Sequence, residues 1–227
     1  MLACLVLGSP HLVAQQGNVD ANAMIKRCRL AVAAQKIDLV GRLRKQGIPN
    51  TPVQVFVREN NLQFRVRDGL FHLRLGESGA ELFTLDTSGG LKPFPANRLI
   101  ERIAGTDVTF EDFALLFLYW PNAQLQGEDT VDGEKCFRIQ INNPGKDGAF
   151  QSVLVWIHKK YGAFWRIKGF DKEGKTLKQF QIRELMTLPN SNDHAIKCMQ
   201  VSALNKEERV QSITYIEFES PKPRGLH

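Results

Sequence analysis

Gly105 to Asn142 reads GTDVTFEDFALLFLYWPNAQLQGEDTVDGEKCFRIQIN, and the residue pattern of this stretch changes at Pro121. Before Pro121 the side chains are mostly large and apolar, with helical spacing. After it, apolar and polar residues alternate on both sides of Asp132-Gly133, which is typical of two strands joined by a tight turn. A short apolar helix followed directly by a half-buried hairpin predicts that the helix covers the apolar face of a sheet.

The predicted helix has a defined start and a defined end. Thr109 can cap the free amides of the first turn, and Asp112 stands three residues later, where a capping acid is expected. Pro121 ends the helix, because proline disfavours helical geometry at the preceding residue and donates no hydrogen bond. The large apolar side chains of the helix are Phe110, Phe113, Leu116, Phe117 and Trp120. Two interpretations follow: a core helix that plugs the sheet, or a movable lid over a lipid-sized cavity.

Alternation with a period of two continues on both sides of this stretch. The expected strands are 37–44, 53–57, 62–67, 71–75 and 82–86 before it, and 125–131, 134–142, 150–158, 163–171, 175–185, 195–203 and 209–218 after it. Between the two runs, SGGLKPFP (Ser88–Pro95) breaks the pattern, and Ala96–Ile103 is expected to form a short helix. Residues 88–122 are therefore predicted to be a helical insertion within one domain.

Length and composition are typical of a single globular domain. The chain has 227 residues, of which 43% are hydrophobic and 24% charged, and β-barrels of this length have one core. We expect the domain at residues 17–219 and a loose tail at 220–227. No window approaches the roughly 18 apolar residues of a membrane-spanning helix, so we do not expect an integral membrane protein.

Met1 to Gln16 (MLACLVLGSPHLVAQQ) resembles the later part of a secretory signal peptide. It has an apolar run, a break at Pro10 and a candidate cleavage site after Ala14, but no Lys or Arg precedes Lys26. We interpret residues 1–16 as the remnant of such a signal. The alternative is an apolar N-terminal arm.

The formal net charge is +6. Part of it lies on a helix predicted from Asp20 to Gln35, where Asp20 suits the cap and Lys26, Arg27 and Arg29 lie away from the apolar face. These cations form either a solvated surface or a contact with an anionic membrane or partner. Because the other basic residues are spread over the polar faces of the strands, we expect no nucleic-acid binding.

The sequence carries no catalytic or metal-binding motif. It lacks a nucleophile-elbow serine, an HExxH pair, a glycine-rich phosphate loop and cysteines at metal-ligand spacing. We therefore predict no enzymatic activity, no cofactor and no metal. Cys136 and Cys198 are expected either to pair across strands or to be buried as small apolar side chains.

Four segments in this order resemble the outer-membrane lipoprotein-sorting proteins, the LolA/LolB-like periplasmic carriers. They are GTDVTFEDFALLF with a following Tyr, LQGEDTVDGEKCFRIQI, VLVWIHKKYGAFWRIKGFDKEGKTLKQFQIREL and KCMQVSALNKEERVQSITYIEF. They contain a Val-Asp-Gly hairpin, a strand with a tryptophan between apolar residues, a second hairpin at DKEG and a last strand that ends in an aromatic residue. The resemblance covers Ile103 to Phe218.

The resemblance implies a mainly β fold (α+β): a half-open antiparallel β-barrel of about 11–12 strands with short helices covering its concave face. It also implies a periplasmic carrier that holds the acyl chains of a lipoprotein or lipid and works with inner- or outer-membrane proteins in lipoprotein sorting. In that family a strand arginine fastens the lid, and Arg58, Arg65 and Arg67 lie in the corresponding region.

Strand parity and the apolar character of ligand pockets assign side chains to a lipid-binding cavity and to its lid. The predicted cavity wall is Phe64, Val66, Phe71, Leu73, Phe137, Ile139, Trp156, Trp165 and Phe180. The predicted lid is Phe113, Leu116, Phe117 and Trp120. The alternative function is an envelope sensor or protein-interaction module on the same fold, with a barrel filled by its own side chains.

Overall fold

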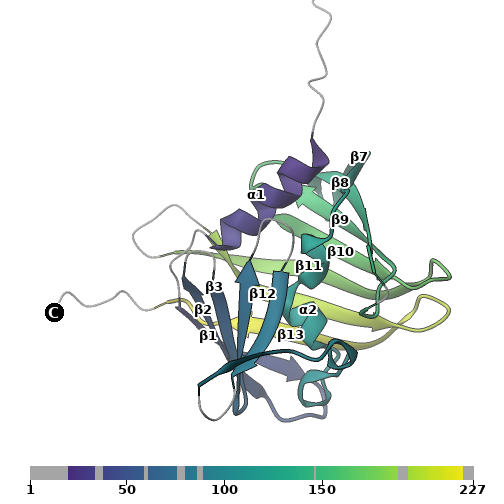
Figure 1. Cartoon of the computed structure of the whole chain (residues 1–227). Coiled ribbons are helices and arrows are strands. Elements are labelled where there is room, and N and C mark those ends of the chain that lie inside the picture. The colour runs from purple at the N-terminus through teal and green to yellow at the C-terminus, as the bar shows by residue number, and fades with distance from the viewer. Residues whose placement is uncertain are drawn as a thin grey trace, which may run out of the picture.

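One antiparallel sheet of 13 strands forms the body of the molecule (Figure 1). The computed structural model describes residues 20–33, 38–58, 61–75, 80–85, 89–145, 147–188 and 194–221. The strand order is β6-β5-β4-β3-β2-β1-β13-β12-β11-β10-β9-β8-β7, so β6 and β7 are the two edges and the sheet is not closed. The half-open antiparallel barrel is therefore confirmed, with 13 strands where about 11–12 are predicted from the sequence.

The strands come in two runs, each a meander in which every strand pairs with the next. The first run is β1 (Asp38–Lys45), β2 (Thr51–Arg58), β3 (Asn61–Val66), β4 (Gly69–Leu75), β5 (Ala80–Leu85) and β6 (Leu91–Pro93). The second run is β7 (Gln124–Val131), β8 (Glu134–Asn142), β9 (Ser152–His158), β10 (Phe164–Phe170), β11 (Thr176–Thr187), β12 (His194–Leu204) and β13 (Val210–Phe218). Strand β6 lies in the segment 88–95, where the sequence predicts only a break.

The two runs join where β1 pairs with β13. Gly41 lies opposite Phe218 in this ladder. A Cβ atom at Gly41 would lie 2.1 Å from the carbonyl oxygen of Glu217, so only glycine allows this close approach. Beside it, Arg42 and Arg44 both donate hydrogen bonds to the carboxylate of Glu217, at 2.8 and 2.9 Å from their Nε atoms.

The core lies on one face of this sheet. On β9, for example, Val153, Val155 and Ile157 are fully buried in the main core, whereas Trp156 belongs to a separate cluster. Successive side chains of a strand point to opposite faces, so Trp156 faces away from the main core. Both faces of β9 are buried, as its continuous apolar run predicts.

Helix α1 (Ala21–Ala33) lies across the molecule and contacts both β2 and the edge strand β7 (Figure 1). Asp20 caps it, since its Oδ1 accepts hydrogen bonds from the amides of Asn22 and Ala23. Met24, Ile25 and Cys28 are buried on its inner side. Among the described helices none is long and apolar enough to cross a membrane.

The insertion between the two runs is less helical than its sequence predicts. The expected helix 96–103 is replaced by two short 3₁₀ turns, η1 (Ala96–Arg98) and η2 (Ile103–Gly105). The expected helix from Phe110 to Pro121 is divided into α2 (Phe110–Ala114) and the 3₁₀ turn η3 (Leu116–Tyr119). The division is at Leu115, which has left-handed geometry with φ 49° and ψ 39°.

The cysteines of the described residues are free thiols. Cys28 and Cys136 are buried, and Cys198 is half-buried. Cys136 is on β8 and Cys198 on β12, with three strands between them. Neighbouring strands are about 4.8 Å apart, so the two thiols are too distant for a disulfide, whose Cα atoms lie within about 7 Å.

Candidate functional site

The candidate site is the apolar interior beneath the lid, which we define as residues 106–120, including α2 and η3. Figure 1 shows α2 enclosed in the bend of the sheet, between the strands of the first run and those of the second. Aromatic side chains of the lid contact both parts of the sheet. The lid therefore connects the two walls of the half-barrel.

The first half of the lid contacts the first run of strands. The ring of Phe113 lies 4.8 Å from that of Phe64 on β3, measured between centroids. The ring of Phe110 lies 4.9 Å from Phe71 on β4 and 4.8 Å from Phe94, which follows β6. Phe64 and Phe71 stack on each other with centroids 5.1 Å apart, so these rings form a continuous aromatic layer. The contacts that the lid makes with it are tilted, a geometry that aromatic pairs prefer over a face-to-face sandwich.

The second half of the lid contacts the second run. Phe117 is fully buried, with its ring 5.6 Å from Phe180 on β11 and 5.7 Å from Phe150, which precedes β9. Phe150 occupies the space above Gly169 on β10, where a Cβ atom would lie 2.4 Å from its ring. The glycine thus makes room for the phenylalanine on which the lid rests.

The structure brings most of the predicted wall residues together in one core. Phe64, Val66, Phe71, Leu73, Ile139 and Phe180 are buried there, and the half-buried Phe137 and Trp165 pack against it. All four predicted lid residues belong to the same core: Phe117 is buried, and Phe113, Leu116 and Trp120 are half-buried against it. Whether these residues contact an acyl chain stays a prediction.

Trp156 is not brought together with the other predicted wall residues. It packs with Val131 and Cys136 on the other face of the sheet, and its Nε1 donates a hydrogen bond to Asp129 Oδ2 at 2.9 Å. Trp165 contacts both clusters, because the ladder between β9 and β10 is irregular at this residue. A β-bulge interrupts the alternation of side chains between the two faces of a strand. Counting along the strand therefore does not give the face of a residue at the bulge.

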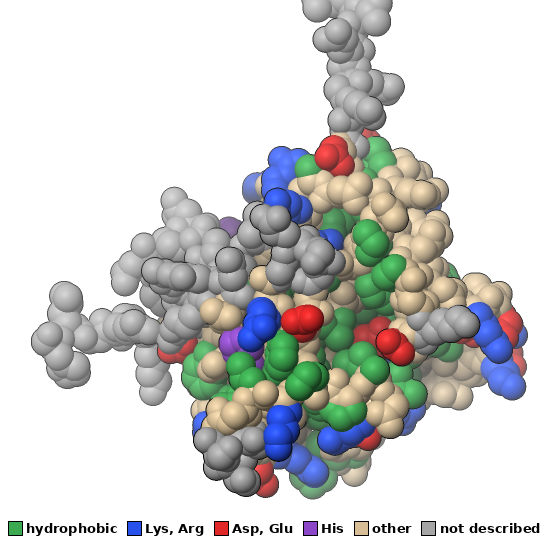
Figure 2. Space-filling view, in the orientation of Figure 1, with side chains coloured by type: hydrophobic (Ala, Val, Ile, Leu, Met, Phe, Trp, Pro, Cys, Tyr) green, Lys and Arg blue, Asp and Glu red, His purple; other side chains and the backbone are tan. Residues whose placement is uncertain are grey.

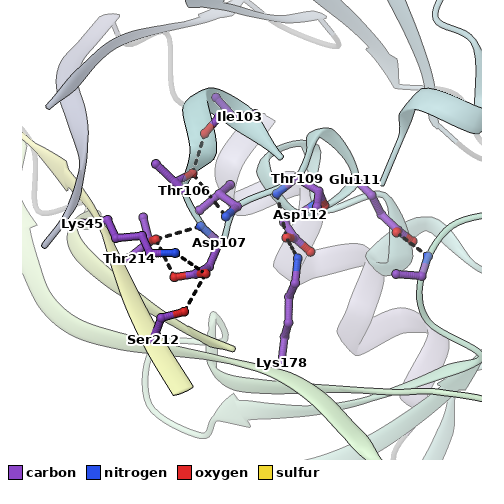
Figure 3. Close-up of polar contacts among 12 residues, drawn as sticks. Lys45, Ile103, Thr106, Asp107, Thr109, Glu111, Asp112, Lys178, Ser212 and Thr214 are labelled. Atoms are coloured by element: carbon purple, nitrogen blue, oxygen red, sulfur yellow. Dashed lines mark hydrogen bonds and ion pairs between the residues drawn. The ribbon is translucent and has the colours of Figure 1, made fainter. Parts of the chain in front are cut away.

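Three buried acidic residues fasten the lid to the surrounding structure (Figure 3). The first is Asp107, at the start of the lid. It accepts hydrogen bonds from Lys45 Nζ at 2.7 Å, Ser212 Oγ at 2.7 Å and Thr214 Oγ1 at 3.0 Å, and its amide donates to Thr214 Oγ1. Burial would raise the pKa of Asp107, but these donors hold it below its ordinary value.

Asp112 has two functions, one within α2 and one toward the sheet. Its Oδ2 accepts from the amide of Thr109 at 2.8 Å, and its own amide donates to Thr109 Oγ1, which completes the predicted capping box. The same oxygen forms an ion pair with Lys178 Nζ on β11. The start of α2 is therefore tied to the second run of strands.

Glu111 fastens α2 to the loop between β8 and β9. Its Oε2 accepts a hydrogen bond from the amide of Ala149 at 2.9 Å, and only 2% of its surface is exposed. Burial raises the pKa of Glu111 to about 7, with the nearby charge of Asp112 adding to the rise. The loop approaches closely at Gly148, where a Cβ atom would lie 2.4 Å from Glu111 Oε1.

Helix α1 contacts the end of the lid through Arg29. The Cζ atom of Arg29 lies 4.8 Å above the ring of Tyr119 in η3. At the other end of α1, Asn22 Oδ1 accepts a hydrogen bond from the amide of Ala123, just after the lid. α1 is thus attached to both the lid and the start of β7.

The capping box of α2 was predicted from the sequence, but the polar contacts that tie the lid to the sheet were not. Of the three candidate arginines, Arg65 and Arg67 have exposed side chains, and the side chain of Arg58 lies outside the described residues. The cations that pair with the lid are instead Lys45 on β1 and Lys178 on β11. Acidic residues in an apolar segment were the available signal, because a buried carboxylate requires a partner.

Two open hollows lie elsewhere on the surface. One, of about 440 Å³, is lined by residues of the β10–β11 and β12–β13 turns, including Asp171, Lys175 and Glu207. The other, of about 350 Å³, lies beside Cys198 and Glu217 at the β1–β13 junction. Over the part of the chain that the structure describes, no group of three His, Cys, Asp or Glu residues could hold a metal ion.

One protein-family model matches the chain. A family model described as "Uncharacterized protein" matches residues 86–224, more than half of the chain. The chain belongs to this uncharacterized family. The matched part of the family fold includes the lid and the whole second run of strands. A comparison with curated protein sequences gives no match.

Solved structures of other proteins show which fold this chain has. A domain assigned as an outer membrane lipoprotein-sorting protein from Vibrio parahaemolyticus has a TM-score of 0.68 at 11% identity, over 91% of this chain and 94% of that chain. A LolA superfamily protein from Nitrosomonas europaea has 0.64 at 14%, over 92% and 96%. A DUF1329 family protein from Desulfovibrio piger has 0.67 at 14%, over 91% and 93%.

These likenesses confirm the resemblance seen in the sequence at the level of the fold. This member of the uncharacterized family has the LolA-like half-barrel over nearly its whole length. Sequence identity of 11–14% shows the fold alone.

Proposed function

We propose that the protein is a non-enzymatic carrier that shields acyl chains of a lipoprotein or related lipid between the sheet and the lid. One observation carries the proposal: Phe113 and Phe117, on opposite halves of the lid, contact rings on β3 and β11 respectively. If the lid moves away, aromatic surface on both walls is uncovered at once. Such a concave apolar surface is what an acyl chain can occupy.

The energetics favour exchange between lid and lipid. An acyl chain gains about 0.8 kcal/mol for each methylene buried, and the lid buries its phenylalanines in the same place when no lipid is bound. Two ion pairs and a few hydrogen bonds hold the lid, and each can break and re-form without a chemical reaction. Binding and release therefore require a change of packing and no catalysis.

The proposed setting is the periplasm, with transfer of lipoprotein toward the outer membrane and contacts to proteins of one or both membranes. The likeness to a lipoprotein-sorting domain supports this setting. The signal-like residues 1–16 also support it, although they lie outside the described residues. Because the closed lid covers the acyl chains, partner proteins would be needed to deliver the lipid to the carrier and to receive it.

Native mass spectrometry of the protein, gently purified from its native host, tests the proposal. We expect the protein mass plus the mass of a bound acyl lipid. The variant Leu116→Glu places a charge in the half-buried lid and should abolish co-purification of the lipid. Leu125→Glu is the matched control, because Leu125 on edge strand β7 is 39% exposed and outside the lid.

An apo mass alone for the wild-type protein would contradict the carrier. It would favour the second candidate, an envelope sensor or protein-interaction module with a self-filled barrel. One observation supports that candidate: Phe117, Phe150 and Phe180 fill the space beneath the lid and are fully buried. Affinity purification that recovers one membrane protein and no lipid would identify it.

A further inference from the structure

We propose that Arg29, at the contact between α1 and the lid, binds the phosphate of an acyl lipid headgroup. The proposal rests on the proposed carrier function and specifies its ligand as an anionic phospholipid. It concerns one side chain whose charge is not paired with a carboxylate among the described residues.

The ring of Tyr119 holds the guanidinium of Arg29 in position, but no carboxylate among the described residues pairs with it. Its Cζ atom lies 4.8 Å above the ring of Tyr119, which fixes the group over the end of η3. Its Nε is buried and has no hydrogen-bond partner. Within the described residues Arg29 also forms no ion pair, whereas Arg42, Arg44 and Arg166 each contact a carboxylate.

Among the described residues, no carboxylate interacts with Arg29. The titratable groups that interact with it are Tyr119 in η3 and its neighbour Cys28 on α1. Burial raises the pKa of Tyr119 to about 12 and that of Cys28 to about 11, so both are neutral at physiological pH. Burial also lowers the pKa of Arg29, although an arginine remains charged in proteins.

An unpaired buried donor on a cation costs free energy that an incoming anion would recover. A guanidinium presents its donors as a planar fork, which matches two oxygens of a phosphate. Lys26 and Arg27 are exposed on the same helix, and Figure 2 shows Lys and Arg side chains gathered over α1. These cations favour the approach of an anionic lipid surface.

The position of Arg29 explains why the phosphate belongs to a lipid. The lid covers the proposed acyl-chain interior, and Tyr119 is at the end of the lid, where the chain leaves toward Pro121. A lipid whose acyl chains occupy the interior can therefore place its headgroup at the guanidinium. Inorganic phosphate would gain the same hydrogen bonds but none of the apolar burial.

The test compares two short-chain lipids with the same acyl chains, phosphatidylglycerol and diacylglycerol, on the full chain stripped of lipid. Dissociation constants are measured by displacement of the neutral fluorescent probe N-phenylnaphthylamine, and inorganic phosphate alone is the third ligand. We expect the wild-type protein to bind phosphatidylglycerol about tenfold more tightly than diacylglycerol. Inorganic phosphate should displace no probe.

Variants assign the preference to Arg29. Arg29→Met, which keeps an apolar stem over Tyr119, should remove the tenfold preference, so that the variant binds phosphatidylglycerol and diacylglycerol with equal affinity. Arg29→Lys keeps the positive charge but lacks the planar fork of donors, so it should retain only part of the preference for phosphatidylglycerol. Arg27→Met is the matched control: it removes the same charge from an exposed site on the same helix, where Nε donates a hydrogen bond to the carbonyl of Ala23.

Equal wild-type affinity for the two lipids overturns the inference but leaves the carrier function intact. Equal losses in Arg29→Met and Arg27→Met overturn it too, because they indicate non-specific attraction to the helix. Displacement by inorganic phosphate as strong as by phosphatidylglycerol would assign a free-phosphate site instead. If Arg29→Met fails to fold by circular dichroism, the wild-type comparison and Arg29→Lys decide. Failure of both lipids to displace the probe removes the carrier function and the inference together.

Discussion

Single buried side chains determine how firmly the lid is held. Asp107, Glu111 and Asp112 are each at most 2% exposed, and each contacts a different part of the sheet or its loops. Removing one partner of such a contact costs more than the contact contributes, because the other partner is left buried without compensation. Lid stability therefore depends on a few polar atoms within an apolar region.

Asp107→Asn should lower the free energy of unfolding by about 3 kcal/mol, because Lys45 loses its counter-charge in a site where it is largely buried. The side chain of Lys45 is only 16% exposed and that of Asp107 is 0% exposed. Urea denaturation measures the loss. Glu101→Gln breaks an exposed pair with Arg98 in the same insertion and should have a much smaller effect. Equal losses in the two variants would contradict the assigned role of Asp107.

Glu111 should make stability depend on pH near neutrality. Its pKa is raised from 4.5 to about 7, so its contribution is fully present below pH 4.5 and is lost as the pH rises through 7. Glu111→Gln does not titrate, and its stability relative to wild type should increase by about 2–3 kcal/mol from pH 5 to pH 8.

Unfolding curves for both proteins at the two pH values measure this difference. Glu173→Gln changes an exposed glutamate, paired only with exposed Lys172, and should show no such trend. If the unfolding free energies of Glu111→Gln and wild type differ by the same amount at pH 5 and at pH 8, the carboxyl of Glu111 ionises without cost to the folded state, and the prediction is wrong.

At the scale of elements, the lid is a capped turn of helix joined to a 3₁₀ turn by a left-handed leucine. Its start follows from local residue chemistry, and the capping box of Thr109 and Asp112 is confirmed. Its division at Leu115 could not be predicted, because leucine favours helices and seldom adopts positive φ. Leu115 packs against the main core in this geometry.

Thr109→Ala should weaken the cap of α2 by about 1 kcal/mol, since the amide of Asp112 loses its acceptor. Hydrogen exchange followed by mass spectrometry should show faster exchange in the peptide covering residues 106–120, with strands β9–β11 unchanged. Thr109→Ser keeps the hydroxyl and should exchange like wild type. Faster exchange spread evenly over the sheet would contradict a local role.

At the scale of the whole molecule, the alternation of apolar and polar residues predicts the two meanders and their common apolar face. Twelve of the strands lie where this alternation places them, whereas β6 is short and proline-containing and has no such pattern. Local patterns carry no information on contacts between distant segments. The pairs Asp107–Lys45, Asp112–Lys178 and Arg29–Tyr119 were therefore missed. Trp156, which was included in the predicted cavity wall, packs in the separate cluster on the other face of the sheet.

Gly41→Ala should destabilise the whole domain by about 2 kcal/mol, because the new methyl group overlaps the backbone of Glu217 where β1 pairs with β13. The loss should appear in one cooperative unfolding transition, since this ladder joins the two runs. Val40→Ala, at a neighbouring residue that is 49% exposed, is the control. Two separate transitions for Gly41→Ala would indicate that the runs fold independently.

The ladder between β1 and β13 also constrains how the chain folds. Arg42 and Glu217, which meet there, are 175 residues apart in the sequence. Contacts of such long range are slow to form, and until they form the facing edges of β1 and β13 both stay open. A nascent chain therefore cannot complete its sheet until the last strand has emerged. During that interval the two open strand edges can pair with other chains.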